Sequence, residues 1–192
     1  LISSVTGCKL VFVSGYYPHK NHGVVAKLCQ ELCRRGMEKD VHIFLTLPRS
    51  GDPRCLKLLA RLSPYSDMVT NLGFVPRAEV PGLYRAADAL FLPTLSETLG
   101  LPYLEAMATG TPILTSDLEF ARWCCQDFGI YFDPLDPVSI ADAIRRFLDQ
   151  GPPPNYRERA RNRLKEFSTN WDQVARAYLQ ILDDAARLGR LN

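Results

Sequence analysis

The chain has 192 residues, enough for one large domain with a substantial core or for two small ones, and one domain is favoured. Its 23 Lys and Arg residues nearly balance its 21 Asp and Glu residues, which gives a formal net charge of +2. This balance excludes a general electrostatic attraction to nucleic acid or to a membrane, so an anionic ligand must be bound locally. The sequence begins with Leu1 and not with methionine, which indicates an excised fragment.

The cysteines and histidines show neither paired CxxC spacing nor a clear ligand set. We therefore expect no metal, no disulfide and a reduced, cytoplasmic compartment. Cys29 and Cys33 lie one helical turn apart and are expected on a buried helix face, whereas His19 and His22 are expected on loops or at the surface. No apolar run is long enough to span a membrane, and no charged stretch is followed by an apolar core, so we expect neither a transmembrane segment nor a secretory leader. The full set is Cys8, Cys29, Cys33, Cys55, Cys124, Cys125, His19, His22 and His42.

Strand and helix signals alternate along the chain. Short β-branched or aromatic runs predict strands at 9–15, 41–47, 69–75, 89–92, 112–116 and 129–132. The segments between them predict helices at 24–36, 54–62, 82–88, 102–108, 118–125 and 138–150. Such alternation is typical of a parallel sheet covered on both faces, so we predict a doubly wound, Rossmann-like α/β fold with six strands.

Two extra helices are predicted after a proline run at 152–154, over 156–167 and 171–188. Their junction offers three candidate N-caps: Ser168, Thr169 and Asn170. Apolar residues repeat at helical spacing in the last helix, and we expect this face to pack on the same domain. The basic residues of the preceding helix spread around its axis, which indicates a solvated face and not a nucleic-acid site: Arg157, Arg159, Arg161, Arg163 and Lys165.

The stretch ETLGLPYLEAMATGTP, residues 97–112, joins a buried strand to the next helix at the carboxyl edge of the predicted sheet, where open α/β sheets bind ligands. Pro102 suits the first helical position, and Gly100 permits a close approach to the backbone. Free N–H groups at the helix start, together with the helix dipole, form an anion site. Glu97 and Glu105, the latter expected in the first helical turn, bracket this site. A nucleotide sugar carries hydroxyl groups on both sides of a diphosphate and fits this layout.

Several charged or aromatic residues of the chain, each taken alone, have an ordinary structural interpretation. Glu105 could be an acid favoured by the helix dipole, and Lys20 could be a solvated loop charge. Asp133 and Asp136 in DPLDP are interpreted as turn and N-cap residues, and Trp123 as a packing residue. The combined spacing of Glu97, Gly100, Pro102 and Glu105 is what favours a ligand site.

The segment PTLSETLGLPYLEAMATGTPILTSD, with Glu97 and Glu105 in an E-x7-E arrangement, resembles the donor-binding signature of the retaining glycosyltransferase family 4, the glycosyl transferases group 1. YYPHKNH (16–22), LGFVP (72–76), LYRAADALFLPT (83–94) and GIYFDPLDPVSIADAI (129–144) extend the resemblance over most of the chain. It implies that residues 1–192 form one nucleotide-sugar-binding domain, the C-terminal half of a GT-B fold. The N-terminal acceptor domain would be missing, and the fragment inactive alone.

The resemblance also implies roles for the matched positions. Glu97 would hold donor-sugar hydroxyls near the reacting carbon, Lys20 would neutralise the diphosphate without a metal, and Glu105 would hold the ribose. The sugar would leave a UDP- or GDP-sugar with retention through an oxocarbenium-like state; Glu97 as a covalent nucleophile is less favoured. A role in polysaccharide biosynthesis and peripheral attachment to the inner membrane through the missing domain are further implications. The remaining donor-binding positions are Gly15, Phe74, Val75, Thr94, Ser96, Leu99, Gly100 and Leu101.

Two positions depart from the family pattern. Gly15 stands where many members carry an arginine, and Trp123 where many carry a glutamate. These departures leave open a second function, a non-catalytic module that binds a nucleotide or nucleotide sugar. A third alternative is another GT-B enzyme, although the E-x7-E spacing points away from an epimerase and no candidate pyridoxal-phosphate lysine supports a phosphorylase.

Overall fold

The computed structural model describes residue 2, residues 5–167 and residues 170–189. Within them, six parallel strands form one sheet in the order β3-β2-β1-β4-β5-β6. The order reverses between β1 and β4, which is the topological switch point of a doubly wound sheet. The predicted six-stranded Rossmann-like fold is therefore confirmed. The strands are β1 (Cys8–Phe12), β2 (Val41–Leu45), β3 (Val69–Asn71), β4 (Ala89–Leu92), β5 (Ile113–Ser116) and β6 (Ile130–Phe132).

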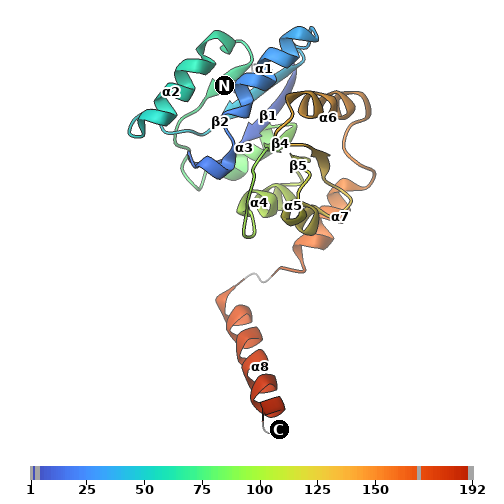
Figure 1. Cartoon of the computed structure of the whole chain (residues 1–192). Helices are drawn as coiled ribbons and strands as arrows, with labels where there is room; N and C mark the ends of the chain where they lie inside the picture. The colour runs from blue at the N-terminus through green and yellow to red at the C-terminus, as the bar shows by residue number, and fades with distance from the viewer. Residues whose placement is uncertain (1, 3–4, 168–169, 190–192) are drawn as a thin grey trace.

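Helices cover both faces of the sheet (Figure 1). On one face α1 (Val24–Arg34) contacts α2 (Pro53–Leu62) and α6 (Pro137–Gln150). On the other, α4 (Leu101–Thr109) contacts α3 (Val80–Ala86) and α7 (Tyr156–Leu164), and α5 (Glu119–Cys125) lies beside β5. Two short 3-10 helices complete this part of the fold, η2 (Pro18–Lys20) and η3 (Ser63–Tyr65).

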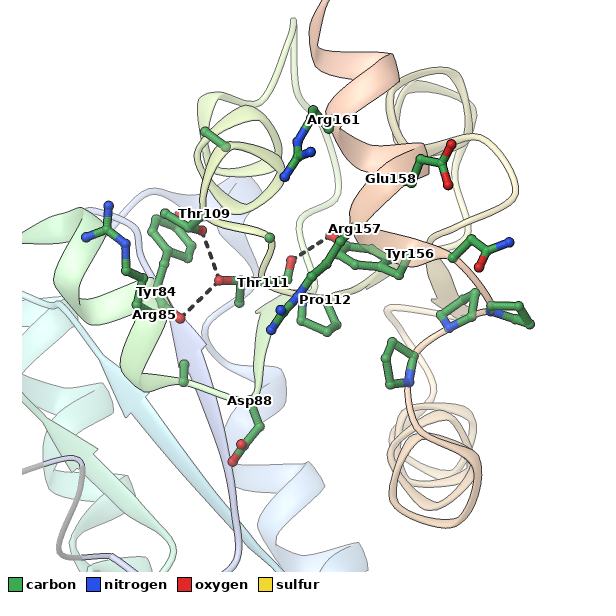
Figure 2. Close-up of a pocket in the computed structure, with 17 residues that line it drawn as sticks. Tyr84, Arg85, Asp88, Thr109, Thr111, Pro112, Tyr156, Arg157, Glu158 and Arg161 are labelled. Atoms are coloured by element: carbon green, nitrogen blue, oxygen red, sulfur yellow. Dashed lines mark hydrogen bonds between the residues drawn. The ribbon is translucent and has the colours of Figure 1, made fainter.

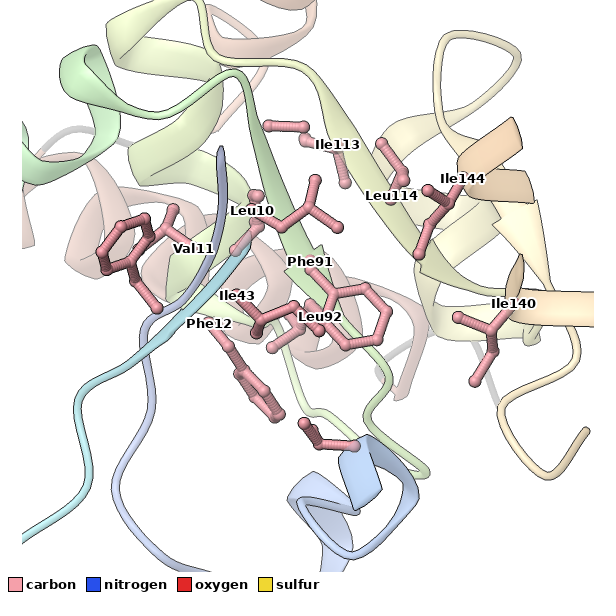
Figure 3. Close-up of a cluster of buried hydrophobic side chains, with 14 of the residues drawn as sticks. Leu10, Val11, Phe12, Ile43, Phe91, Leu92, Ile113, Leu114, Ile140 and Ile144 are labelled. Carbon is pink, nitrogen blue, oxygen red and sulfur yellow. The ribbon is translucent and has the colours of Figure 1, made fainter. Parts of the chain in front are cut away.

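The core lies between these layers, and the strands β2, β4 and β5 are buried over their whole length. Parallel strands covered on both faces require continuous apolar runs, which explains why these segments lack polar alternation. Figure 3 shows apolar side chains of β1, β2, β4 and β5 that pack on the sheet together with Ile140 and Ile144 of α6. The Phe91 ring lies 6.0 Å from the Phe12 ring and 5.6 Å from the Phe132 ring between centroids.

The strands β1, β2 and β3 end earlier than predicted, at residues 12, 45 and 71. Beyond these ends, side chains replace the strand-to-strand hydrogen bonds. Ser14 donates its backbone N–H to Thr46 Oγ1 (3.0 Å), and Leu47 donates to Asn71 Oδ1 (3.0 Å). The carboxyl edge of the sheet is thus built from loops fixed by polar side chains, and it carries the candidate site.

Arg163 is buried, although the sequence indicated a solvated face for α7. Its guanidinium lies 5.0 Å from the Trp123 ring and 4.8 Å from the Phe167 ring, and it donates to the carbonyls of Trp123 (2.7 Å) and Cys124 (3.1 Å). It therefore satisfies carbonyl groups at the C-terminal end of α5. Trp123 itself is 58% exposed and not a core residue, and Cys33 is also exposed, because it lies at the end of α1 beyond the buried stripe.

The last helix, α8 (Trp171–Gly189), does not pack on the sheet or its helices, contrary to the expectation from its apolar repeat. Figure 1 shows it extending away from the layers, and Trp171, Tyr178 and Ile181 are each more than 60% exposed. Amphipathic spacing predicted the helix correctly but does not identify a partner surface. Asn170 accepts a hydrogen bond from the Gln173 N–H (3.0 Å) as an N-cap; Ser168 and Thr169 lie outside the described residues.

Asp133 and Asp136 have the structural roles that the sequence indicated. Asp136 caps α6 by accepting the Val138 N–H (2.9 Å), and Asp133 accepts the Leu135 N–H (2.9 Å) in the preceding turn. Among the described residues, no helix is long and apolar enough to cross a membrane.

Candidate functional site

The candidate site lies where β1 and β4 end, at the switch point of the sheet. Because both strands end at the same edge, the loop after β1 and the loop after β4 meet there although they are far apart in sequence. The Leu95 N–H and the Thr94 hydroxyl both donate to the carbonyl of His19, at 2.7 and 3.1 Å. These bonds join the two loops directly.

Asn21 fixes the same region from a position that the sequence did not single out. Its backbone is left-handed (φ 58°), a conformation that asparagine tolerates better than most residues. Its side-chain amide donates to the carbonyls of Pro93 (3.1 Å) and Pro134 (2.8 Å). One side chain thereby ties the loops after β1, β4 and β6 together, directly beside Lys20.

Lys20 and Glu97, the two predicted catalytic residues, form an ion pair at this junction. Lys20 Nζ lies 2.5 Å from Glu97 Oε1, and the two side chains are only 12% and 10% exposed. Two charges can be buried here because each compensates the other. An ammonium group has three N–H donors and a carboxylate two oxygens, so both groups keep capacity for a ligand.

The N-terminus of α4 adjoins this pair and is uncapped by any side chain. Within the described residues, the backbone N–H groups of Leu99, Gly100 and Leu101 have no hydrogen-bond partner, so they are orphan donors of a helix start. Gly100 has φ 73°, and a Cβ there would lie 2.6 Å from Tyr103 Cδ2. Glycine is therefore required at this turn, and the turn exposes donors suited to an anion.

Glu105 lies in the second turn of α4 and not in the first, because the helix begins one residue earlier than predicted, at Leu101. Its Oε2 accepts a hydrogen bond from the hydroxyl of Tyr84 (3.0 Å), a fully buried residue of α3. Burial raises the pKa of Tyr84 well above its usual range, so the hydroxyl remains a donor. Tyr84 is thus, after Asn21, a second residue of the candidate site that the sequence did not single out.

A cavity of about 460 Å³ opens at the same edge, between the loops after β1 and β3. It brings together three predicted donor-binding residues, Gly15, Phe74 and Val75, with Tyr16 and Val80 also in its wall. Phe74 is 83% exposed, so a flat apolar surface faces solvent beside the cavity. This environment suits a planar ring.

The remaining predicted positions lie on the loop after β4 and at the first residue of α4. Thr94 is fully buried, and its hydroxyl shares its one hydrogen between the backbone carbonyls of His19 (3.1 Å) and Ser96 (3.2 Å), so it fixes the shape of the loop. Ser96 is exposed, Leu99 is half-buried, and Leu101 is 61% exposed.

His22 lies on the loop before α1, as expected, but it is buried (2% exposed) and not at the surface. Its ring stacks on Phe12 with centroids 4.3 Å apart, and neither ring nitrogen has a hydrogen-bond partner among the described residues. Burial, assisted by the charge of Lys20, lowers the pKa of His22 to about 3. The imidazole ring of His22 is therefore neutral over the physiological pH range.

Comparison with known proteins gives consistent results. Residues 5–171 match the family described as glycosyl transferases group 1. Relatives include the D-inositol 3-phosphate glycosyltransferases of Salinispora arenicola (33% identical; 93% of this chain and 42% of the relative) and Corynebacterium diphtheriae (26% identical; 93% and 43%). The chain thus spans less than half the length of the curated relatives that it matches.

Two solved structures share the fold. Sucrose-phosphate synthase from Thermosynechococcus elongatus superposes with a TM-score of 0.71 at 22% identity, over 97% of this chain and 46% of that one. TarM superposes with a TM-score of 0.72 at 14% identity, over 92% and 35%. At these identities the likeness concerns the fold.

Proposed function

The chain belongs to the glycosyl transferases group 1 family, and from this premise we propose that it binds a nucleotide-sugar donor and supports transfer of the sugar with retention. The observation that carries the proposal is the largely buried Lys20–Glu97 pair beside the uncapped N-terminus of α4. It combines a cation, a carboxylate and free N–H donors at the switch-point crevice of the sheet.

The donor would lie along the carboxyl edge in three parts. The base would occupy the cavity beside Phe74 and Val75, the ribose hydroxyls would donate to Glu105, and the diphosphate would face the N–H groups of Leu99 to Leu101. Lys20 would then use its remaining N–H donors on a phosphate oxygen while it still holds Glu97.

In the transfer step, negative charge develops on the diphosphate as the bond to the sugar breaks. Lys20 and the N-terminus of α4 would stabilise that charge electrostatically, so we propose that no divalent metal is needed. The second carboxylate oxygen of Glu97 would accept a hydroxyl of the sugar and hold the reacting carbon in place. Because Gly15 offers no side-chain charge, Lys20 would carry most of the phosphate neutralisation.

The test is isothermal titration of the chain with UDP, GDP and their sugar conjugates, in the presence of EDTA. We expect one base to bind, and we expect Glu105→Ala and Lys20→Met each to weaken it about tenfold or more, since each removes a charged hydrogen bond. Glu38→Ala and Lys39→Ala are matched controls, because both residues are exposed and precede β2 at the opposite edge of the sheet.

Thermal unfolding of every variant shows whether the fold is retained. Binding that the control variants weaken as much as Glu105→Ala and Lys20→Met would contradict the proposed site. Absence of binding by the folded chain to every nucleotide tested would contradict the proposed function.

A further inference from the structure

A cavity of about 1160 Å³ lies at the amino edge of the sheet, opposite the candidate donor site. Its walls are the segments entering β4 and β5, the prolines 152–154 and the first turns of α7 (Figure 2). Because β4 and β5 begin here, the length of these strands separates the cavity from Lys20 and Glu97, which lie at the opposite edge of the sheet. The proposed donor binding makes no use of this cavity.

Buried hydrogen bonds fix the wall of the cavity. The Tyr156 hydroxyl donates to the carbonyl of Thr111 (2.6 Å), the Thr111 hydroxyl donates to the carbonyl of Tyr84 (3.0 Å), and the hydroxyls of Thr109 and Thr111 lie 2.9 Å apart. Figure 2 shows this chain running from α7 across the α4–β5 loop to α3. The three elements are thereby held in one arrangement before any ligand arrives.

Three arginines line the cavity: Arg85 in the last turn of α3, and Arg157 and Arg161 of α7. None of the three guanidinium groups has a hydrogen bond or ion pair within the part of the chain that the structure describes. Arg157 and Arg161 are four residues apart, so they share one face of α7. The stem of Arg157 lies over Gly110, with its Cγ 3.5 Å from where a Cβ would be. By contrast, the neighbouring Arg159 and Arg163 pair with Asp127 and Glu166.

The acidic residues around the cavity do not cancel these charges. Asp88 accepts the Lys9 backbone N–H (2.7 Å), and its carboxylate lies 3.7 Å from Lys9 Nζ. Glu158 follows Arg157 directly, so it projects about 100° around the helix from it. Glu158 also lines the cavity, but within the described residues its carboxylate forms no ion pair with any of the three arginines. The α7 N-terminus, which has no side-chain cap, adds further positive potential.

We propose that this cavity binds a phosphate group that is attached to a small organic moiety. Guanidinium groups match phosphate oxygens with paired N–H donors, and unpaired arginines are available on two sides of the cavity. The volume exceeds the need of a bare phosphate, and the rings of Pro152 to Pro154 offer an apolar surface to the rest of the ligand. A soluble phosphate ester and a phospholipid headgroup share this chemistry.

Backbone-amide NMR spectra of the chain titrated with inorganic pyrophosphate test the site. Pyrophosphate also fits the donor site, so the Gly110 and Arg157 amides are followed separately from those of Gly100 and Leu101. We expect a saturable shift at Gly110 and Arg157 that Arg157→Gln with Arg161→Gln weakens about tenfold. Lys57→Gln with Arg61→Gln is the matched control, since it removes two exposed charges at the same spacing from α2.

Equal weakening of pyrophosphate binding by both double variants would overturn the proposal, because the effect would then depend only on the net charge of the chain. The absence of a saturable shift at the Gly110 amide would overturn it as well. Sedimentation with vesicles of phosphatidylcholine and about one-third phosphatidylglycerol separates the two sources. If the chain sediments with the vesicles and the Arg157→Gln, Arg161→Gln variant does not, the ligand is a lipid headgroup. If the chain binds pyrophosphate but does not sediment with the vesicles, the ligand is a soluble phosphate ester.

Discussion

Single residues set the charge balance of the candidate donor site, and the Lys20–Glu97 pair is the clearest case. Removing Lys20 leaves a largely buried carboxylate without compensation, so we expect Lys20→Met to lower the free energy of unfolding by about 2 kcal/mol. Replacing both members, Lys20→Met with Glu97→Gln, should recover most of that loss. Urea unfolding measures both variants, and a double variant no more stable than Lys20→Met would contradict this expectation.

Tyr84 is expected to act as a positioning residue through Glu105, if the proposed ribose contact is correct. Tyr84→Phe removes only the hydroxyl that holds Glu105 Oε2. We expect it to reduce the preference for a nucleoside diphosphate over its 2′-deoxy analogue by about fivefold, because Glu105 loses its fixed orientation. A merely structural role would lower stability and leave that preference unchanged.

His22 makes stability depend on pH. Its pKa is about 6.5 in the unfolded chain and about 3 in the folded one, so between these values the unfolded chain binds more protons. The free energy of unfolding should therefore fall as pH is lowered through this window, by up to about 3 kcal/mol between about pH 6.5 and pH 4. His22→Leu should flatten the profile, whereas His19→Leu, at an exposed position, should not. Equal slopes in all three proteins would refute the assignment.

The sequence indicated the charged site residues but not their supports. Lys20, Glu97 and Gly100 belong to recognisable spacings, and the structure brings all three to one junction. Tyr84 and Asn21 act through contacts with residues distant in sequence, Glu105 for one and Pro93 and Pro134 for the other. Local periodicity marks such residues only as buried or as turn-forming, so their partners could not be read from it.

At the scale of secondary structure, the turn into α4 is the element on which the proposed anion binding depends. Gly100→Ala would place a Cβ 2.6 Å from Tyr103 Cδ2 in a left-handed turn. Gly36 also has positive φ, but nothing lies within 4 Å of a Cβ there, so Gly36→Ala isolates the conformational cost. We expect Gly36→Ala to cost about 1 kcal/mol and Gly100→Ala about 1–3 kcal/mol more.

Unfolding titrations of the two glycine variants give the comparison directly. Similar losses would show that Tyr103 yields to the added methyl group. If Gly100→Ala alone is the more damaging change, the close packing of Tyr103 under the turn is what fixes the free N–H groups of Leu99 to Leu101.

The positions of the strands and helices were largely predictable from the sequence, whereas the ends of three strands and the environment of α8 were not. All six strands and the helices between them occur where the patterns indicated, since buried parallel strands leave unambiguous apolar runs. The ends of β1, β2 and β3 were placed too late because the apolar runs continue into loops that side chains such as Thr46 and Asn71 hold. For α8, the apolar face was identified but its environment was not, because periodicity carries no information about a partner.

At the scale of the whole molecule, the strand order explains why the candidate site lies between β1 and β4. The connection that leaves β1 runs to the face of α1 and the connection that leaves β4 runs to the face of α4, so the two loops diverge at this point of the sheet and leave room for a ligand between them. The sequence predicted the parallel sheet, and the E-x7-E resemblance pointed to this edge. Nothing in the pattern pointed to the arginine-lined cavity at the other edge, since its three arginines come from two helices that meet only in the folded chain.

The most direct measurement is a crystal structure of the chain with whichever nucleoside diphosphate binds it. We expect the diphosphate between Lys20 Nζ and the N–H groups of Leu99 to Leu101, the ribose on Glu105 and the base beside Phe74. A nucleotide held elsewhere, for example among Arg85, Arg157 and Arg161, with Lys20 and Glu97 left untouched, would contradict the proposed donor site.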